Sequence, residues 1–405
     1  MNDDDRHRSG FTEFTRTAAA REQLLDAVTP VGRTERVPLR AADERVVATT
    51  VDAKRAVPHY ERAAMDGFAV RAAETFDASD RTPATFRVAD SVGPGTAVRV
   101  HTGSELPEGA DAVVKVEDTE LSDGEVAVFD AVPERNNVAP VGEDVAADQR
   151  LFEAGHRLRP GDVGLLKAVG FETVEVYERP HVSVVPTGEE LVQADPDPGE
   201  IIETNGMTVA QYVERWGGEP TYRDVVTDDA DSLRAAITGD RDHDIVVTTG
   251  GSSVGERDLV PDVVAELGEL LVHGVALKPG HPVALGVVEG TPVLMLPGYP
   301  VACIVTAVQF LRPVIERVGH LNHASPPTTD ARLTRKIPSE PGVRTFARVT
   351  MDSDGDEATA TPTRAKGAGV LSSVALSDGW VVVPEDREGY ADGEAVAVEQ
   401  WEWSR

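Results

Sequence analysis

The sequence predicts a multidomain protein that combines α/β and β domains, and three observations support this fold class. The chain has 405 residues, enough for roughly two to four domains of ordinary size. Between residues 181 and 320, apolar strands alternate with helical segments, which is typical of a doubly wound parallel sheet. Residues 56–145 and about 75 residues at the C-terminal end instead contain short strands separated by Pro and Gly.

These patterns predict four domains. A helical linker domain comprises residues 10–55 and 146–179 and is interrupted by a β-rich inserted domain at 56–145. The doubly wound α/β domain occupies 180–322, and a small C-terminal β-barrel occupies 326–405. The Pro- and Thr-rich segment 323–332 is expected to link the last two domains.

Local patterns place the individual elements. Apolar residues at helical spacing predict a helix within 13–28, and a helix followed by a strand within 157–180. The letters "SDG" at 122–124 are a hairpin signal. In the α/β domain we expect strands in "HVSVVPTGEEL", "TYRDVVTDD", "HDIVVTTGG" and "TPVLMLPGYP". Helices are expected near 205–216, in "ADSLRAAITG", after Asp258 and in "VACIVTAVQFLRPVIERVG".

The charge balance restricts the partners. The net charge of -31 argues against a general nucleic-acid binder, because a polyanion would be repelled. Only six of the 39 basic residues are Lys, and this acidic, Lys-poor balance predicts a halophilic host, an archaeon in our interpretation, rather than an acidic mesophile. A single Cys excludes an intramolecular disulfide. With neither a signal peptide nor a long apolar run, we expect a cytoplasmic protein with no membrane role.

The segment "TTGGSSVGERD", residues 248–258, connects a predicted strand to a predicted helix. Its glycines allow the backbone to approach a ligand and to turn N–H groups toward a phosphate or another oxyanion. It is not a P-loop, because Glu256 and Arg257 stand where Lys and Ser/Thr are needed. The candidate ligand-binding residues are Gly250, Gly251, Ser253 and Gly255. The alternative is a tight connection without a ligand.

Carboxylates follow other strands of the same predicted sheet: Glu189, Glu190, Asp228, Asp229 and Asp258. Around a phosphate loop such groups would hold Mg²⁺, which prefers oxygen ligands, and the candidate metal ligands are Glu190, Asp228 and Asp258. The alternative is that each carboxylate caps a helix.

Two more loops follow strands and are candidates for holding an anion. "KPGHP" offers Lys278 and His281 around a rigid turn, and "LPGYP" offers Pro297, Gly298 and Pro300. Surface turns are the alternative, and Tyr299 fits packing as well as stacking.

Several motifs together resemble the MoeA/gephyrin E-domain family, the molybdopterin molybdenumtransferases. They are "PHYERAAMDGFAV", "HTGSELPEGADAVVKVEDT", "VGED", "LRPGD", "PTGEEL", "TTGGSSVGERD", "KPGHP" and "LPGYPV", in the family's order and spacing over about residues 10–400. The resemblance implies a MogA-like α/β domain. It also implies insertion of molybdate or tungstate into adenylylated molybdopterin with Mg²⁺ and release of AMP. The implied protomer dimerises, with the active cleft shared between two subunits.

The resemblance also assigns residues. Asp66 and Thr102 would face the partner's cleft, with Asp144 nearby, and Glu190, Asp228, Asp258 and Lys278 match residues of the α/β domain. Arg348 and Ser372 or Ser373 resemble oxyanion-binding residues of the last domain. Further implied partners are a molybdopterin adenylyltransferase and the recipient molybdoenzymes.

The chain departs from the family pattern at several positions where the family usually has a hydrogen-bond donor. They are His281, Tyr299, Ala302, Ala63, Val343 and the segment "NNVAPVGED". Two alternatives therefore stay open: a molybdopterin adenylyltransferase-like enzyme, and a module that binds or scaffolds the cofactor without turnover.

Overall fold

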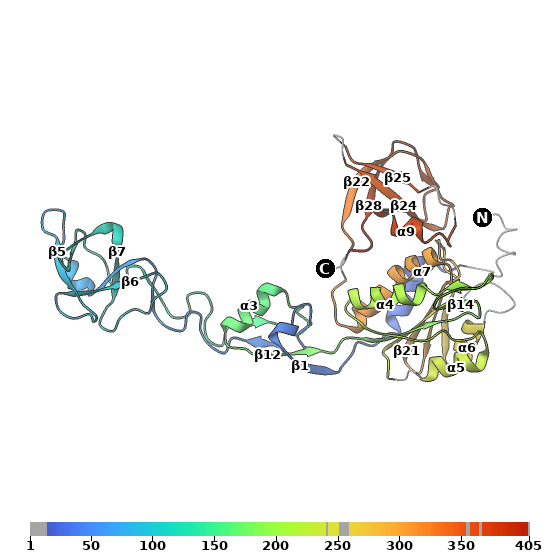
Figure 1. Ribbon diagram of the computed structural model, residues 1–405, viewed down its shortest axis with the longest axis horizontal. Coiled ribbons are helices and arrows are strands. Elements are labelled where there is room, and N and C mark those ends of the chain that lie inside the picture. Colours follow the sequence, from blue (N-terminus) through green and yellow to red (C-terminus); the bar gives the residue numbers. More distant parts are fainter. Residues whose placement is uncertain are drawn as a thin grey trace. The chain divides into compact units, whose positions relative to one another are not determined.

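The structure is a computed structural model that describes residues 14–239, 242–250, 259–323, 325–353, 357–363 and 367–403. The chain forms two compact units (Figure 1): residues 35–176 make the smaller one, and the segments on either side, 1–34 and 177–405, together make the larger one. Within the described ranges, no helix is both long and apolar enough to cross a membrane.

Part of the smaller unit is a six-stranded sheet in the order β7-β4-β6-β5-β9-β8. Its strands are β4 (Gly67–Val70), β5 (Ala84–Val88), β6 (Thr96–Val100), β7 (Ala112–Lys115), β8 (Thr119–Ser122) and β9 (Glu125–Val128). Phe68, Phe86 and Val126 are buried in its core. The predicted hairpin is confirmed, because β8 pairs with β9 across Asp123 and Gly124, whose φ angles of 49° and 83° suit a type I′ turn.

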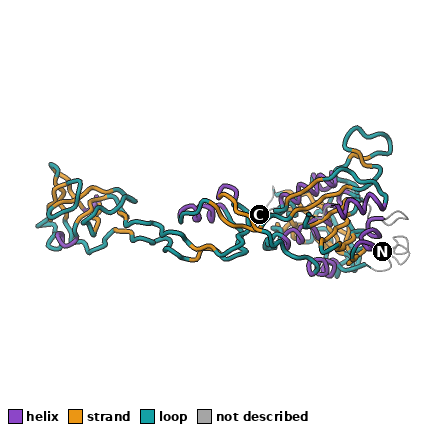
Figure 2. The backbone as a smooth tube through the Cα atoms, turned by 90° about the horizontal axis from the view of Figure 1, so that it is seen from below, coloured by secondary structure: helices purple, strands orange, loops and turns teal. Residues whose placement is uncertain are grey.

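The rest of the smaller unit joins segments that are far apart in the sequence. Here β1 (Thr34–Pro38) pairs with β12 (Thr173–Tyr177), β2 (Val51–Asp52) with β11 (Arg150–Phe152), and β3 (Arg62–Ala63) with β10 (Val138–Ala139). The predicted helix and strand within 157–180 are present as α3 (Pro160–Ala168) and β12. At the start of α3, Asp162 accepts a hydrogen bond from the Arg159 N–H at 3.0 Å. Strands and loops predominate in this unit (Figure 2).

The larger unit contains a second six-stranded sheet, in the order β16-β13-β17-β21-β20-β18. Its strands are β13 (His181–Pro186), β16 (Glu219–Tyr222), β17 (Ile245–Thr249), β18 (Glu269–His273), β20 (Ala284–Val288) and β21 (Thr291–Leu296). Strands β16, β13, β17 and β21 are parallel, as predicted. The sheet also contains two strands that were not predicted, β18 and β20, and β20 is antiparallel to both β21 and β18. The cause is a two-residue turn, Glu289 and Gly290 with φ of 51° and 90°, which forces β20 and β21 into a hairpin.

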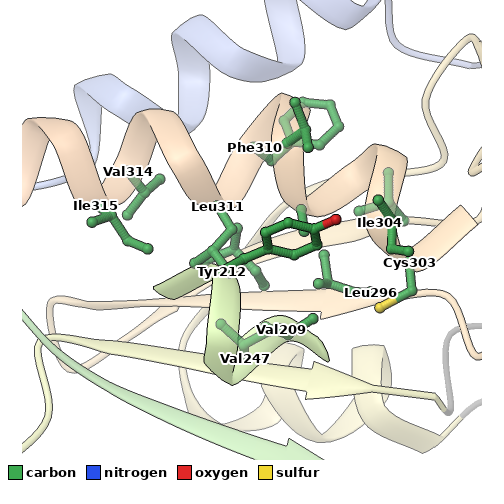
Figure 3. Packing of buried hydrophobic residues seen from close by; sticks show 14 of the residues in the cluster. Val209, Tyr212, Val247, Leu296, Cys303, Ile304, Phe310, Leu311, Val314 and Ile315 are labelled. Atoms are coloured by element: carbon green, nitrogen blue, oxygen red, sulfur yellow. The ribbon is translucent and has the colours of Figure 1, made fainter. Parts of the chain in front are cut away.

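Helices cover both faces of this sheet, which is therefore doubly wound. On one face, α2 (Thr17–Asp26), α4 (Asn205–Arg215), α7 (Pro300–Thr306) and α8 (Arg312–Val318) enclose a core that includes Val247 and Leu296. Figure 3 shows Tyr212 of α4 and Leu311 packed in this core. On the other face, α5 (Ala230–Gly239) and α6 (Leu259–Leu267) pack on Val246 and Met295. The predicted helix along 301–319 is present, but residues Ala307–Leu311 between α7 and α8 form a π-helix.

The C-terminal strands close into a small barrel. They are β22 (Thr328–Leu333), β24 (Arg344–Asp352), β25 (Thr359–Pro362), β26 (Gly379–Val383) and β28 (Ala395–Glu399), and β24 also pairs with β26, which closes the ring. A short strand from the α/β sequence, β19 (Leu277–Lys278), adds to the edge of β24. The expectation that 323–332 is only a linker is wrong at its end, because β22 begins at Thr328 and alternates exposed with buried residues.

The remaining short elements lie around these sheets. They are η1 (Leu39–Ala41), η2 (Ala72–Thr75), η3 (Val116–Asp118), β14 (Leu191–Val192), β15 (Ile201–Ile202), β23 (Ile337–Pro338), α9 (Ser372–Ala375) and β27 (Gly389–Tyr390).

Candidate functional site

The chain changes direction in the α/β sheet between β13 and β17. After β13 it crosses through α4 to β16 on one side, then returns through α5 on the opposite face to β17 on the other side. Ligands of doubly wound sheets bind beyond the carboxyl ends of the strands at such a switch point. The residues that follow these two ends are Thr187 and Gly250.

Gly250 allows two backbones to approach each other closely. Its φ is +128°, and a Cβ at this position would lie 2.3 Å from the carbonyl oxygen of Thr187. Its N–H donates to the Leu296 carbonyl at 3.0 Å, so the glycine is fixed to both neighbouring strand ends. Any larger residue here would separate them. The predicted ligand residues Gly251, Ser253, Gly255 and Asp258 lie outside the described residues.

Three threonine hydroxyls at these strand ends were not identified from the sequence. The Oγ1 atoms of Thr187, Thr248 and Thr249 are buried and have no hydrogen-bond partner within the described ranges. A buried polar atom without a partner costs about 1–3 kcal/mol, which a ligand or a neighbouring loop would recover. The sequence signal was available, since "PTG" and "TTG" place polar side chains where apolar strands end.

The acidic residues after β13 and β16 divide into two roles. Asp229 caps α5, because its Oδ1 accepts a hydrogen bond from the Ser232 N–H at 2.9 Å. Asp228 is different: its Oδ1 is buried and has no partner among the residues that the structure describes. Burial, followed by the negative charges of Glu190 and Glu189, raises the pKa of Asp228. A nearby cation would therefore stabilise the ionised form of Asp228.

The side chain of Glu190 folds back over its own loop. Its carboxylate oxygens lie 2.9 and 3.0 Å from the position of a Cβ on Gly188, which has φ of +146°. No cluster of three or more His, Cys, Asp or Glu side chains suited to a metal ion occurs within the described part of the chain. Asp258 lies outside that part, so of the three predicted metal ligands only Glu190 and Asp228 are described, and the charge of Glu190 acts on the pKa of Asp228.

The loop after β21 meets the same strand ends. The Gly298 carbonyl accepts a hydrogen bond from Nδ2 of Asn205 at 2.6 Å, and the Cα of Gly250 lies 3.6 Å from a Cβ position on Gly298. Pro297 and Pro300 flank this contact and restrict the backbone of the loop. Asn205, at the start of α4, was not identified from the sequence.

The "KPGHP" loop separates its two predicted cations. Lys278 is exposed, and its Nζ lies 3.2 Å from Oε1 of Glu340. His281 is half-buried and packs edge-to-face on Phe14, with 5.8 Å between the ring centroids. Burial, and then the charge of Lys278, lowers the pKa of His281 below 6.5. Lys278 therefore carries the positive charge of this loop at neutral pH.

The barrel contributes Arg348 and the "GAGVLSS" loop. Arg348 is half-buried in β24, and burial lowers its pKa. Ser372 is exposed, whereas Ser373 is buried and donates to the Val370 carbonyl at 2.7 Å, which leaves Ser372 as the available hydroxyl. The Ala368 carbonyl accepts a hydrogen bond from the Val301 N–H at 2.9 Å, so this loop meets the "LPGYP" loop.

In the smaller unit, Asp66 and Thr102 form one cluster. The Thr102 N–H and hydroxyl both donate to Oδ1 of Asp66 at 2.7 Å. These two hydrogen bonds, in that order, lower the pKa of Asp66, with a smaller contribution from His101. Asp144 is exposed, and its N–H donates to the Val57 carbonyl at 3.0 Å.

The fold defines a multidomain α/β protein whose doubly wound sheet has glycines, threonines and carboxylates at its switch point, the position where such sheets bind ligands. Three family models match successive parts of the chain: the MoeA N-terminal region (domain I and II) at 15–170, a probable molybdopterin binding domain at 183–317, and the MoeA C-terminal region (domain IV) at 330–401. The chain belongs to the MoeA family of molybdenum cofactor biosynthesis.

Several proteins are similar to this chain over nearly its full length. A putative molybdopterin biosynthesis protein of Methanocaldococcus jannaschii is 34% identical, over 93% of this chain and 94% of the relative. A molybdopterin molybdenumtransferase of Bacillus subtilis is 32% identical, over 92% and 93%. A crystal structure of a MoeA protein from Pyrococcus horikoshii superimposes with a TM-score of 0.82 at 33% identity, covering 96% of this chain and 100% of that one.

Proposed function

We propose that this protein inserts molybdate or tungstate into adenylylated molybdopterin and releases AMP. Relatives named molybdopterin molybdenumtransferase that match nearly the full chain support this activity. The observation that carries the proposal is the close approach of Gly250 to Thr187 at the switch point of the sheet. Asp228, which follows the neighbouring strand β16, has a raised pKa. A phosphate can approach the backbone of a glycine closely, and a nearby cation would stabilise the ionised form of a buried carboxylate. Together these features suit a phosphoryl group bound to Mg²⁺.

In this proposal each residue has a defined task. Glu190, Asp228 and Asp258 would hold Mg²⁺, which would neutralise the phosphate oxygens as AMP leaves. Gly250 and Gly298 let the substrate approach the strand ends, with Gly251, Ser253 and Gly255 extending the phosphate loop. Lys278, Arg348 and Ser372 would hold the tetrahedral oxyanion, because a dianion needs positive charge and hydrogen-bond donors.

We further propose a homodimer in which Asp66, Thr102 and Asp144 act on the substrate bound to the partner subunit. The two hydrogen bonds from Thr102 keep Asp66 ionised and hold one of its oxygens in place, which suits a group that positions a substrate. Mixed dimers of Asp66→Ala and Asp228→Ala subunits should regain activity, because each dimer keeps one complete cleft. Mixtures as inactive as the separate variants would contradict the shared cleft.

The activity is tested with the purified full-length chain, adenylylated molybdopterin, Mg²⁺ and either oxyanion. We expect AMP release that depends on the oxyanion, together with metal retained on the pterin product. Asp228→Asn and Asp258→Asn should abolish release and weaken Mg²⁺ binding in calorimetry. Formation of adenylylated molybdopterin from ATP and molybdopterin, without oxyanion-dependent AMP release, would instead identify an adenylyltransferase. Substrate binding with no turnover would identify a scaffold.

A further inference from the structure

The exposed apolar side chains of the larger unit are not scattered over its surface. Among its described residues, the large apolar side chains with high exposure are Ile201, Ile202, Met207, Tyr222, Tyr299 and Leu376. All but Leu376 lie on segments at the carboxyl edge of the α/β sheet: β15, the first turn of α4, the last residue of β16 and the loop after β21. An exposed apolar cluster on one edge of a protein marks a binding surface.

Tyr299 is the aromatic residue of this group that is most open to solvent. It is 65% exposed, whereas Tyr222 is 38% exposed and is held by a hydrogen bond from its hydroxyl to Glu203 at 2.5 Å. Tyr299 lies between Gly298 and Pro300, and Gly298 is fixed by Asn205 and adjoins Gly250. The ring therefore projects from a rigid loop next to the strand ends where the phosphate is proposed to bind.

One edge of the Tyr299 ring is supported by the barrel. A Cβ on Gly369 would lie 3.4 Å from Cδ1 and 3.8 Å from Cε1 of Tyr299, so the backbone of Gly369 lies against this edge. The Val301 N–H donates to the Ala368 carbonyl at 2.9 Å and joins the two loops. Because one edge of the ring is already held in place, the side chain loses little conformational entropy when a ligand covers its open face.

We propose that Tyr299 is a specificity-determining residue that stacks against a fused nitrogen heterocycle of the substrate. This inference rests on the proposed function, because adenylylated molybdopterin contains two such rings, adenine and pterin, close to its phosphates. Stacking of a base on an aromatic side chain contributes about 1–3 kcal/mol. The interaction needs a planar ring but no hydrogen bond from the Tyr299 hydroxyl.

Binding of separate fragments to the full-length protein tests this role without any turnover. The probes are AMP, 6-hydroxymethylpterin and, as the ligand without a ring, ribose 5-phosphate. We expect Tyr299→Ala to weaken binding of AMP, of the pterin, or of both by about 5- to 150-fold, the factor that corresponds to the stacking energy. Tyr299→Phe should stay within about twofold of wild type, because the ring remains. The probe that responds identifies the ring that stacks.

Phe76→Ala is the matched control, because it removes a side chain that is 57% exposed from the smaller unit, and it should change no affinity. The proposal is overturned if Tyr299→Ala, folded like wild type, binds both ring probes with wild-type affinity, or if it loses ribose 5-phosphate equally. Wild-type protein that binds neither ring probe also overturns it. The proposed function would fail by a different result. In that case the protein would bind the ring probes in a way that depends on Tyr299, but AMP release would not depend on the oxyanion.

Discussion

Thr102 donates two hydrogen bonds to the same oxygen of Asp66. Its N–H and its hydroxyl both lie 2.7 Å from Oδ1. Both bonds favour the ionised carboxylate and lower the pKa of Asp66, although the side chain is on the surface. Thr102 therefore fixes both the charge and the direction of Asp66.

Replacing Thr102 by Val should remove one of these bonds and keep the other. We expect the pKa of Asp66 to rise toward its ordinary value of about 3.9, and AMP release to fall roughly tenfold through poorer positioning. NMR titration of Asp66 and an activity assay measure both effects. Thr102→Ser keeps the hydroxyl and is the control. An Asp66 titration identical in the Val and Ser variants would show that the hydroxyl bond is unimportant.

Asp228→Asn should stabilise the protein in the absence of Mg²⁺. Because the pKa of Asp228 is raised by burial and by Glu190, its ionised form is penalised at pH 7, and the penalty disappears as pH falls through the raised pKa. We expect the variant's Tm to exceed that of wild type by roughly 1–4 °C at pH 7, with a smaller difference at pH 4. Scanning calorimetry without divalent ions measures this.

Asp229→Ala is the matched control for Asp228, since it changes the next residue but removes a helix cap. The hydrogen bonds of Asp229, first those involving Ser232 and then Thr227, lower its pKa to about 2. This variant should therefore lower the Tm at pH 7. If both variants shift the Tm in the same direction, the distinction between the two carboxylates is wrong.

Gly250→Ala should destabilise the strand ends. The new methyl group would meet the Thr187 carbonyl at 2.3 Å, and φ of +128° is strained for Ala. We expect a loss of about 1–3 kcal/mol in the free energy of unfolding from the backbone strain alone. Gly164→Ala is the control, because Gly164 lies inside α3 with open space around it, and this change should add about 0.5–1 kcal/mol. Urea denaturation compares them, and equal stability of the Gly250 variant and wild type would exclude the close approach.

Oxyanion binding should be nearly constant above pH 7. Because the pKa of His281 lies below 6.5, its ring is neutral there and Lys278 supplies the charge. Protonation of His281 favours anion binding, so the affinity for molybdate should rise only as pH falls below about 6.5. Calorimetric titration from about pH 5.5 to about pH 9 measures this dependence in wild type and in His281→Gln, for which we expect no such rise. A rise of equal size in both proteins would exclude His281.

The net charge of -31 predicts dependence on salt. Below roughly 1 M salt the Debye length exceeds ~3 Å, and unscreened carboxylates repel one another more strongly in the compact state. We expect the Tm to fall by several degrees as KCl is lowered from about 2 M to about 0.1 M. A Tm that does not change with salt would remove the inference of a halophilic host.

Local chemistry was predictable from the sequence, whereas contacts between distant segments were not. The turn at Asp123 and Gly124 was predictable because two adjacent residues determine it. The same chemistry at Glu289 and Gly290 marks a hairpin, but the alternation of strands and helices around it suggested parallel strands. The contact of Asn205 with Gly298 spans 93 residues, and no local pattern encodes it.

The candidate site was also predictable only in its local features. Glycines and carboxylates after the strands predicted a location for it, because the carboxyl ends of parallel strands share one edge. The distinction between Asp228 and Asp229 depends on which oxygen reaches the start of α5, and that depends on the backbone geometry of the turn. The packing of His281 on Phe14 depends on how the N-terminal segment folds back on the sheet.

Lys278 belongs to the α/β sequence but is hydrogen-bonded into the barrel. Strand β19 pairs with β24, with Leu277 opposite Arg344 and Lys278 opposite Thr345, and the Arg344 N–H donates to the Ala276 carbonyl at 2.9 Å. The backbone that carries this ammonium group is therefore attached to the barrel. A rotation of the barrel against the α/β sheet would carry Lys278 along with Arg348 and change the distance of both residues from Gly250. The orientation of the barrel would then set how near these two positive charges come to the strand ends.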